Sequence, residues 1–211
     1  MAVIKKGILG GFKGKAGAVI GYHLMEQDIM RGVANDRTKP YTKGEVLNQA
    51  KFGSTQPWLQ PLTAVFRIGF AGYKPNSHGF NGAKSFYANH VVAGLKPFHY
   101  IDPALACISH GNLFAGTELR VELIEGNQIL YTWKKEGPFE YNDRAMAVAY
   151  DINGKHADFD TGLSMRGTGK GILQMSVHRP GTEVHLYLGF VTDDRKERSI
   201  SQYLGMVKIP E

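Results

Sequence analysis

From about residue 100 to the end of the chain, apolar residues recur at every second position, and this alternation limits the possible folds more than any other feature. Its longest run joins Val184, Leu186, Leu188 and Phe190. A period of two places apolar side chains on one face of a β-strand. Turn sequences such as Glu125-Gly126-Asn127 interrupt the alternation repeatedly. The C-terminal half is therefore predicted to form antiparallel strands joined by short turns.

The spacing of these turns predicts the architecture of the C-terminal half. About seven or eight short strands with a turn every ten or so residues are typical of an immunoglobulin- or fibronectin-like sandwich. Trp133 is a candidate for the central buried aromatic residue of such a fold. We expect residues 99–211 to form this β-sandwich domain and to be self-contained, with a boundary between about residues 95 and 103.

Residues 18–98 are predicted to form a β-hairpin followed by short helices, which makes the chain α+β overall. Alternation over residues 18–33, interrupted by a polar turn, indicates the hairpin. Thr42 and Glu45 have the spacing of a capping box, so a helix should begin there and end near Gly53.

Two further helices are expected after the first. Proline is tolerated in a first helical turn, so the second helix should open at Pro57 or Pro61. The third should cover residues 79–92, where aromatic residues recur at helical spacing. Aromatic residues at this spacing belong to a hydrophobic core more often than to a cofactor-binding site.

Residues 1–17 are rich in glycine and contain four lysines. Glycine loses more backbone freedom than other residues when it becomes ordered. This segment is therefore predicted to be a flexible basic arm that orders only against a partner.

Charge is distributed unevenly between the halves of the chain. Residues 1–100 contain 13 Lys/Arg and 4 Asp/Glu, whereas residues 101–211 contain 12 and 15. The basic half could face nucleic acid or an acidic protein surface. The residues predicted to bind a partner are Ile8, Phe12, Lys13, Lys15, Arg31, Arg37 and Lys39.

No motif places catalytic or cofactor-binding groups together. Gly10 to Ala16 resembles a phosphate-binding loop only loosely, because Leu9 stands where its first glycine should be. The single cysteine, Cys107, and the scattered histidines offer no zinc pattern. Ser164 misses the nucleophile-elbow spacing by one residue. We therefore expect no enzymatic activity, no metal and no cofactor.

The sequence also carries expectations about location. No apolar run approaches the roughly 18 residues of a membrane span, and the N-terminal apolar stretch is too short for a secretory signal. A bacterial cytoplasm or a virion is the expected location, with no membrane partner.

The stretch Gly7-Ile8-Leu9-Gly10-Gly11-Phe12-Lys13-Gly14-Lys15-Ala16-Gly17 resembles the opening of an uncharacterised family from Bacteroidetes genomes and their phages. The resemblance continues through Thr42, Gln49 and Phe52 and ends near Tyr203-Leu204-Gly205. It departs where Pro40-Tyr41 replaces an Asn-Pro pair. The resemblance implies a small protein associated with phages or mobile elements. Of the roles that this implies, we favour a component of the virion.

Three functions are consistent with these features. A structural protein that self-associates or docks on a capsid or tail explains the arm, the sandwich and the missing active site. A nucleic-acid-binding protein explains the charge asymmetry. A cell-surface adhesion module explains only the sandwich. We expect protein partners, a homo-oligomer or virion proteins, ahead of nucleic acid.

Overall fold

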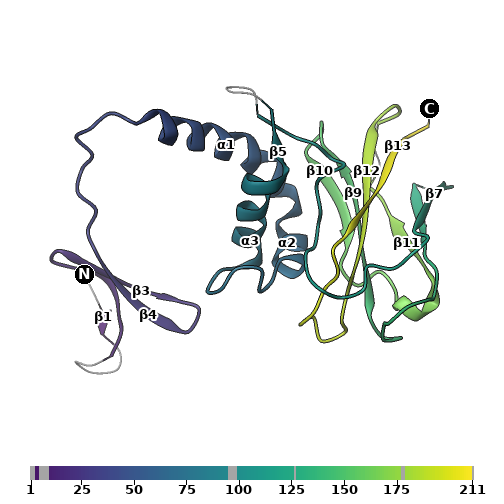
Figure 1. Ribbon diagram of the computed structural model, residues 1–211, viewed down its shortest axis with the longest axis horizontal. Helices are drawn as coiled ribbons and strands as arrows, with labels where there is room; N and C mark the ends of the chain where they lie inside the picture. Colours follow the sequence, from purple (N-terminus) through teal and green to yellow (C-terminus); the bar gives the residue numbers. More distant parts are fainter. Residues whose placement is uncertain (1–2, 5–9, 95–98, 126, 177–178, 211) are drawn as a thin grey trace. The chain divides into compact units, whose positions relative to one another are not determined.

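The computed structural model describes residues 3–4, 10–94, 99–125, 127–176 and 179–210 (Figure 1). The chain divides into two compact units, residues 1–45 and residues 46–211. The boundaries predicted at residues 17 and 98 do not coincide with this division, because β2 (Phe12–Ala16) of the predicted arm pairs with β3 (Val19–Leu24) of the hairpin and the helices pack against the β-domain. The chain is mostly β, with short helices.

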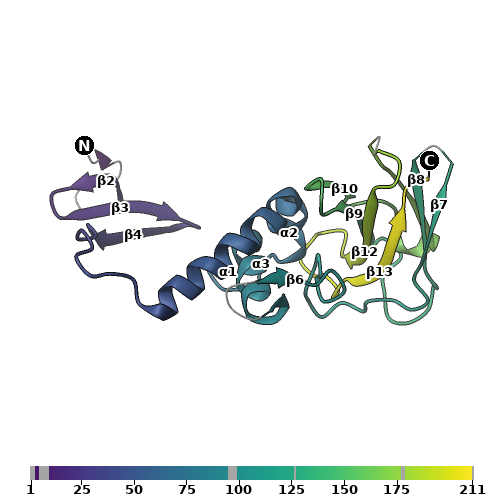
Figure 2. The ribbon, with the colours of Figure 1, turned by 90° about the horizontal axis from the view of Figure 1, so that it is seen from above.

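The N-terminal unit is a four-stranded antiparallel sheet (Figure 2). The predicted hairpin is confirmed, and its turn lies at Met25 and Glu26, which both have positive φ. Positive φ at both central residues matches the right-handed twist of the flanking strands. The strands, in spatial order, are β1 (Val3–Ile4), β2 (Phe12–Ala16), β3 (Val19–Leu24) and β4 (Gln27–Gly32).

Most of the described part of the predicted flexible arm is β-structure. Residues 12–16 form β2, which pairs with β3 in the register Gly14↔Gly21. A Cβ on Gly21 would collide with the carbonyl oxygen of Phe12, so glycine permits this close approach. Residues 12–16 therefore pair with the hairpin, and the predicted free arm is not confirmed. Ile8 lies outside the described residues.

The predicted capping box opens helix α1 (Lys43–Leu59). The Thr42 N–H donates to Glu45 Oε2 over 2.8 Å, and the Glu45 N–H donates to Thr42 Oγ1 over 3.3 Å. Arg37 also donates to both carboxylate oxygens of Glu45, at 2.9 and 2.7 Å. These hydrogen bonds, led by the one from Arg37, lower the pKa of Glu45 to about 2.

Both prolines that were predicted to open a second helix lie within helical structure. Helix α1 continues through Pro57, and the 3₁₀ turn η1 (Gln60–Leu62) has Pro61 in its first turn. The remaining helical elements are α2 (Thr63–Gly69), α3 (Gly79–Phe86) and the π-helical turn η2 (Tyr87–Val91). No helix among the described residues is long and apolar enough to cross a membrane.

The β-domain is a two-sheet sandwich of fibronectin-like architecture. One sheet has the strand order β11-β8-β7, and the other has the order β10-β9-β12-β13. A two-stranded β5-β6 pair precedes the sandwich, and the turn η3 (Arg166–Thr168) lies before β11. The strands are β5 (Val92–Ala93), β6 (Tyr100–Ile101), β7 (Arg120–Ile124), β8 (Gln128–Thr132), β9 (Arg144–Asp151), β10 (His156–Asp160), β11 (Lys170–Gln174), β12 (Glu183–Val191) and β13 (Gln202–Lys208).

Strand β9 is buried on both faces and joins two hydrophobic cores. Ala145, Ala147 and Ala149 pack into the core between the two sheets. Met146, Val148 and Tyr150 face the helices, in a core with residues of α1, α2 and η2. The helices lie beside the sheet that contains β9 (Figure 1). The Tyr150 hydroxyl donates to the Trp58 carbonyl over 2.8 Å. The helices and the sandwich therefore form one packed unit of three layers.

A buried arginine lies at one end of the sandwich core. Arg166 is 1% exposed, and its guanidinium lies 4.1 Å from the ring centroid of Phe190. Asp143, also 1% exposed, is its ion-pair partner at 3.9 Å. Burial lowers the pKa of Arg166 and raises that of Asp143. The Arg166 carbonyl accepts the indole N–H of Trp133 over 2.7 Å, so this residue holds the central tryptophan in place.

Candidate functional site

Three of the predicted cationic residues lie on one face of the N-terminal sheet. Lys15 and Arg31 lie opposite Ile20 on the two neighbouring strands, so all three side chains share a face. Lys13 is two residues before Lys15 on β2, and side chains two residues apart on a strand lie on the same face. Arg31 also lies 5.9 Å from the ring centroid of Tyr22. We call Lys13, Lys15 and Arg31, with Ile20 and Tyr22, the cationic face.

The other predicted partner-binding residues lie elsewhere. Arg37 is tied to Glu45 and donates to the carbonyls of Lys39 and Pro40, so it organises the start of α1. Lys39 is exposed in the segment between β4 and α1. Phe12 is next to Lys13 on β2, so its side chain lies on the opposite face of the sheet. The Phe12 ring packs against Gly21. The structure therefore groups only part of the predicted set.

The N-terminal unit has almost no core of its own. Gly21 is the single buried residue among its described residues 10–45. Met30 is 64% exposed and Met25 is 41% exposed. A small sheet normally needs a hydrophobic face packed against other structure to be stable. This unit therefore lacks the internal packing that would stabilise it in isolation.

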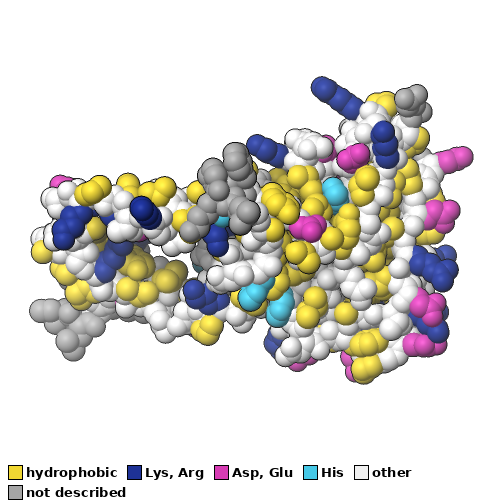
Figure 3. All heavy atoms as spheres, turned by 45° about the horizontal axis from the view of Figure 1, so that its top comes forward, with side chains coloured by type: hydrophobic (Ala, Val, Ile, Leu, Met, Phe, Trp, Pro, Cys, Tyr) yellow, Lys and Arg dark blue, Asp and Glu magenta, His cyan; other side chains and the backbone are white. Residues whose placement is uncertain are grey.

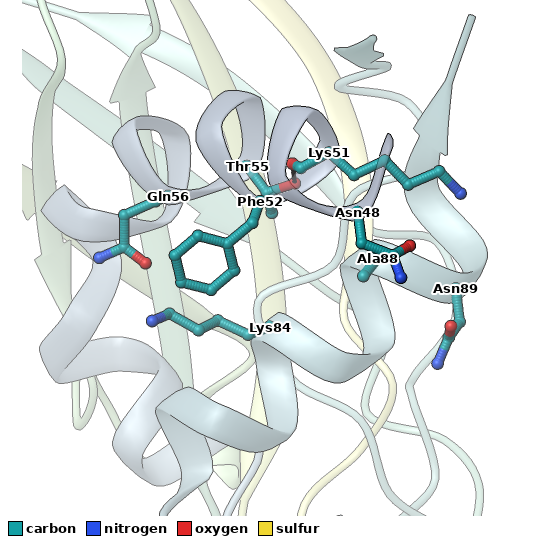
Figure 4. Close-up of a pocket in the computed structure, with 8 residues that line it drawn as sticks. All are labelled: Asn48, Lys51, Phe52, Thr55, Gln56, Lys84, Ala88 and Asn89. Carbon is teal, nitrogen blue, oxygen red and sulfur yellow. Dashed lines mark hydrogen bonds between the residues drawn. The ribbon is translucent and has the colours of Figure 1, made fainter. Parts of the chain in front are cut away.

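A second candidate site is a cavity of about 190 Å³ between α1 and the α3–η2 segment (Figure 4). Side chains of α1 line one side of it, and side chains of α3 and η2 line the other. The cavity-lining residues are Asn48, Lys51, Phe52, Thr55, Gln56, Lys84, Ala88 and Asn89.

Two polar groups in this cavity have unused bonding capacity. The Lys84 ammonium lies 4.7 Å from the ring centroid of Phe52 and 4.8 Å from that of Phe80. No carboxylate pairs with it among the described residues. Gln56 Oε1 is buried and accepts no hydrogen bond within the described part of the chain. A buried acceptor without a donor costs free energy that a ligand could recover.

The cavity belongs to a long segment without acidic residues. No Asp or Glu occurs between Glu45 and Asp102, whereas five Lys or Arg do. Figure 3 shows acidic side chains gathered mainly over the β-sandwich. Our sequence interpretation missed the cavity residues, although this acid-free run and the helical spacing of Asn48, Lys51, Phe52 and Thr55 were signals for them.

A wider groove lies where the segment after α2 meets the turn between β12 and β13. Its volume is about 720 Å³, and Arg195, Lys196 and Arg198 contribute to its wall. Lys196 pairs with Asp194 at 3.1 Å. Arg198 donates to the carbonyls of Arg195 and Lys196. Two of these three cations are therefore already engaged within the protein.

Three residues of types that often act in catalysis, Cys107, Ser164 and Asp160, are engaged in structural contacts. Burial raises the pKa of the Cys107 thiol to about 12, and Ser164 Oγ donates to the Lys170 carbonyl over 2.8 Å. Asp160 accepts the Gly162 N–H over 2.8 Å, and His178 lies outside the described residues. In the described ranges no three His, Cys, Asp or Glu residues gather as a metal site would require. The absence of enzymatic activity stays a prediction.

Comparisons with known proteins add a family and one structural likeness. A model of a family of unknown function (DUF6266) matches residues 11–205. Among curated proteins, none matches the sequence significantly. A solved structure, the crystal structure of chicken CNTN1 FN1-FN3 domains, matches with a TM-score of 0.34 and 8% identity over 48% of this chain and 33% of that chain. The chain thus spans about a third of that structure's length. Strand order and register define the sandwich independently of this match.

Proposed function

The chain belongs to the family of unknown function DUF6266, and from this starting point we propose that it is a non-enzymatic assembly protein that binds further copies of itself. The N-terminal unit of one copy packs on the β-sandwich of another. A phage particle or a related mobile element is the assembly that the resemblance of residues 7–17 suggests.

The observation that carries this proposal is the N-terminal sheet without a core. Its exposed apolar side chains, Met25 and Met30, would be covered in a complex. Removing apolar surface from water contributes roughly 25 cal/mol per Å². Association would therefore supply the packing that the sheet lacks within its own unit.

Charge favours a second copy as the partner. Residues 1–45 contain eight Lys or Arg and four Asp or Glu, whereas residues 101–211 carry three more acidic than basic residues. The cationic face of one copy is thus complementary to the sandwich of the next. Such contacts between two different surfaces produce a ring if the rotation closes and a filament if it does not.

Nucleic acid is the second candidate partner, and the cationic face is the observation in its favour. Lysines and arginines can follow a phosphate backbone, and the Tyr22 ring could stack on an unpaired base. This candidate ranks second because the face holds three clustered cations, which are few for tight binding on their own.

Deleting the N-terminal unit should abolish self-association. The full chain is expected to form assemblies larger than a monomer at about 0.1 M salt. At this ionic strength the attraction between the cationic face and acidic side chains of the sandwich still acts over ~10 Å. A chain of residues 46–211 should be a folded monomer, since both hydrophobic cores lie within it. Size-exclusion chromatography with light scattering measures both masses.

A matched pair of variants controls for net charge. Lys13, Lys15 and Arg31 replaced together by glutamate should give a monomer. Glutamate at the exposed positions Lys43, Arg67 and Lys74, which lie outside both the cationic face and the sandwich, makes the same change in net charge and should leave the assemblies intact. A monomeric full chain would contradict the proposal, and retention of single-stranded DNA by that monomer would favour nucleic acid instead.

A further inference from the structure

We infer that the cavity between α1 and the α3–η2 segment binds a carboxylate side chain, aspartate or glutamate, presented by an extended segment of another protein. This site lies outside the N-terminal unit and does not depend on the proposed self-association.

The charge of the cavity selects an anion. Lys51 and Lys84 are half-buried residues of its wall, and neither ammonium group pairs with a carboxylate among the described residues. The acid-free run between Glu45 and Asp102 supplies no carboxylate from the same segment. An incoming carboxylate would form charge-assisted hydrogen bonds there, which are stronger than bonds between neutral groups.

The hydrogen-bonding pattern selects a peptide. Gln56 Oε1 requires a donor, and a carboxylate alone cannot provide one. The backbone N–H groups beside an acidic residue in an extended segment can do so. The amide side chains of Asn48 and Asn89 also line the cavity, and each can donate to and accept from a peptide backbone.

Size and the aromatic rings argue against a nucleotide. A volume of about 190 Å³ is below the roughly 300–1,000 Å³ of pockets that enclose drug-sized ligands. The Lys84 ammonium also lies over the Phe52 ring, where a base would have to stack. The wall contains no arginine, the residue that best matches the geometry of phosphate.

The test uses two synthetic peptides and the full chain. Nuclear magnetic resonance should show that acetyl-Gly-Glu-Gly-Glu-Gly-amide shifts the side-chain amide signals of Asn48, Gln56 and Asn89. The same peptide with glutamine in place of both glutamates should bind at least tenfold more weakly. Equal shifts with both peptides, or none with either, would overturn the assignment.

Variants locate the site. Lys84→Met keeps most of the apolar stem and removes the charge, and it should weaken binding of the glutamate peptide at least tenfold. Lys74→Met removes one exposed charge away from the cavity and should leave binding unchanged. If Lys84→Met does not fold, Lys51→Met replaces it with the same expectation. Equal affinity of both charge-removal variants, or tighter binding of oligothymidylate or inorganic phosphate than of the peptide, would also overturn the inference.

Discussion

Replacing Arg166 by alanine should lower the free energy of unfolding by about 3–5 kcal/mol, since removing one partner of a buried ion pair leaves the other charge uncompensated. Asp143 is 1% exposed and would lose its cationic partner. The contact between the guanidinium and the Phe190 ring would be lost as well. Urea denaturation followed by the fluorescence of the tryptophans measures this change.

A surface ion pair next to this site provides the control. Arg144 donates to Asp193 over 3.0 Å, and their side chains are 35% and 61% exposed. Arg144→Ala should cost less than about 1 kcal/mol, the usual limit for exposed pairs. The double variant Asp143→Asn with Arg166→Met should recover part of the lost stability, because no charge is then buried. Equal losses for Arg166→Ala and Arg144→Ala would contradict the account of this pair.

A fragment of residues 99–211 should fail to form a stable domain, whereas residues 46–211 should fold cooperatively. Without the helices, Met146, Val148 and Tyr150 would face water. Burying one such side chain contributes roughly 1.5–3 kcal/mol, so the loss is comparable with the whole stability of a domain. Circular dichroism during thermal unfolding of both fragments measures the difference.

Limited proteolysis of the full chain provides an independent check. Cleavage should fall in the exposed segment of residues 34–42 and leave a fragment close to residues 46–211. A stable product of about 110 residues that begins near residue 99 would support the boundary predicted from sequence and contradict the three-layer unit.

Local signals were enough to predict several elements of the fold. The capping box of Thr42 and Glu45 opens α1 because its two hydrogen bonds depend only on residues three apart. The alternation of Val184, Leu186 and Leu188 likewise predicted strand β12, and these three side chains lie in the core between the sheets. These predictions needed no knowledge of which elements pack together.

The packing between elements could not be predicted in the same way. The alternation after about residue 100 predicted strands with one apolar face, but residues 145–150 form an uninterrupted apolar run, which is typical of burial on both faces. Recognising that run would have indicated the layer of helices on the second face. The glycine-rich residues 1–17 were predicted to be flexible, but residues 12–16 form β2, and this pairing depends on the partner strand β3.

The candidate sites were likewise predictable only in part. Lys13, Lys15 and Arg31 were identified as partner-binding residues, but only the strand register places them on one face. Lys84 and Gln56 were missed because the cavity joins side chains from separate helices. Charge composition is visible in a sequence, whereas the convergence of distant side chains requires the fold.

The central claim, that the cationic face of one copy contacts the sandwich of another, is tested most directly by cross-linking between labelled copies. An equal mixture of ¹⁴N and ¹⁵N chains is treated with a carbodiimide, which joins amines to carboxylates without a spacer. Mass spectrometry should find mixed-isotope links from Lys13 or Lys15 to carboxylates within residues 101–211. If the links from these two lysines join only residues of the same isotope, the contact between copies does not exist.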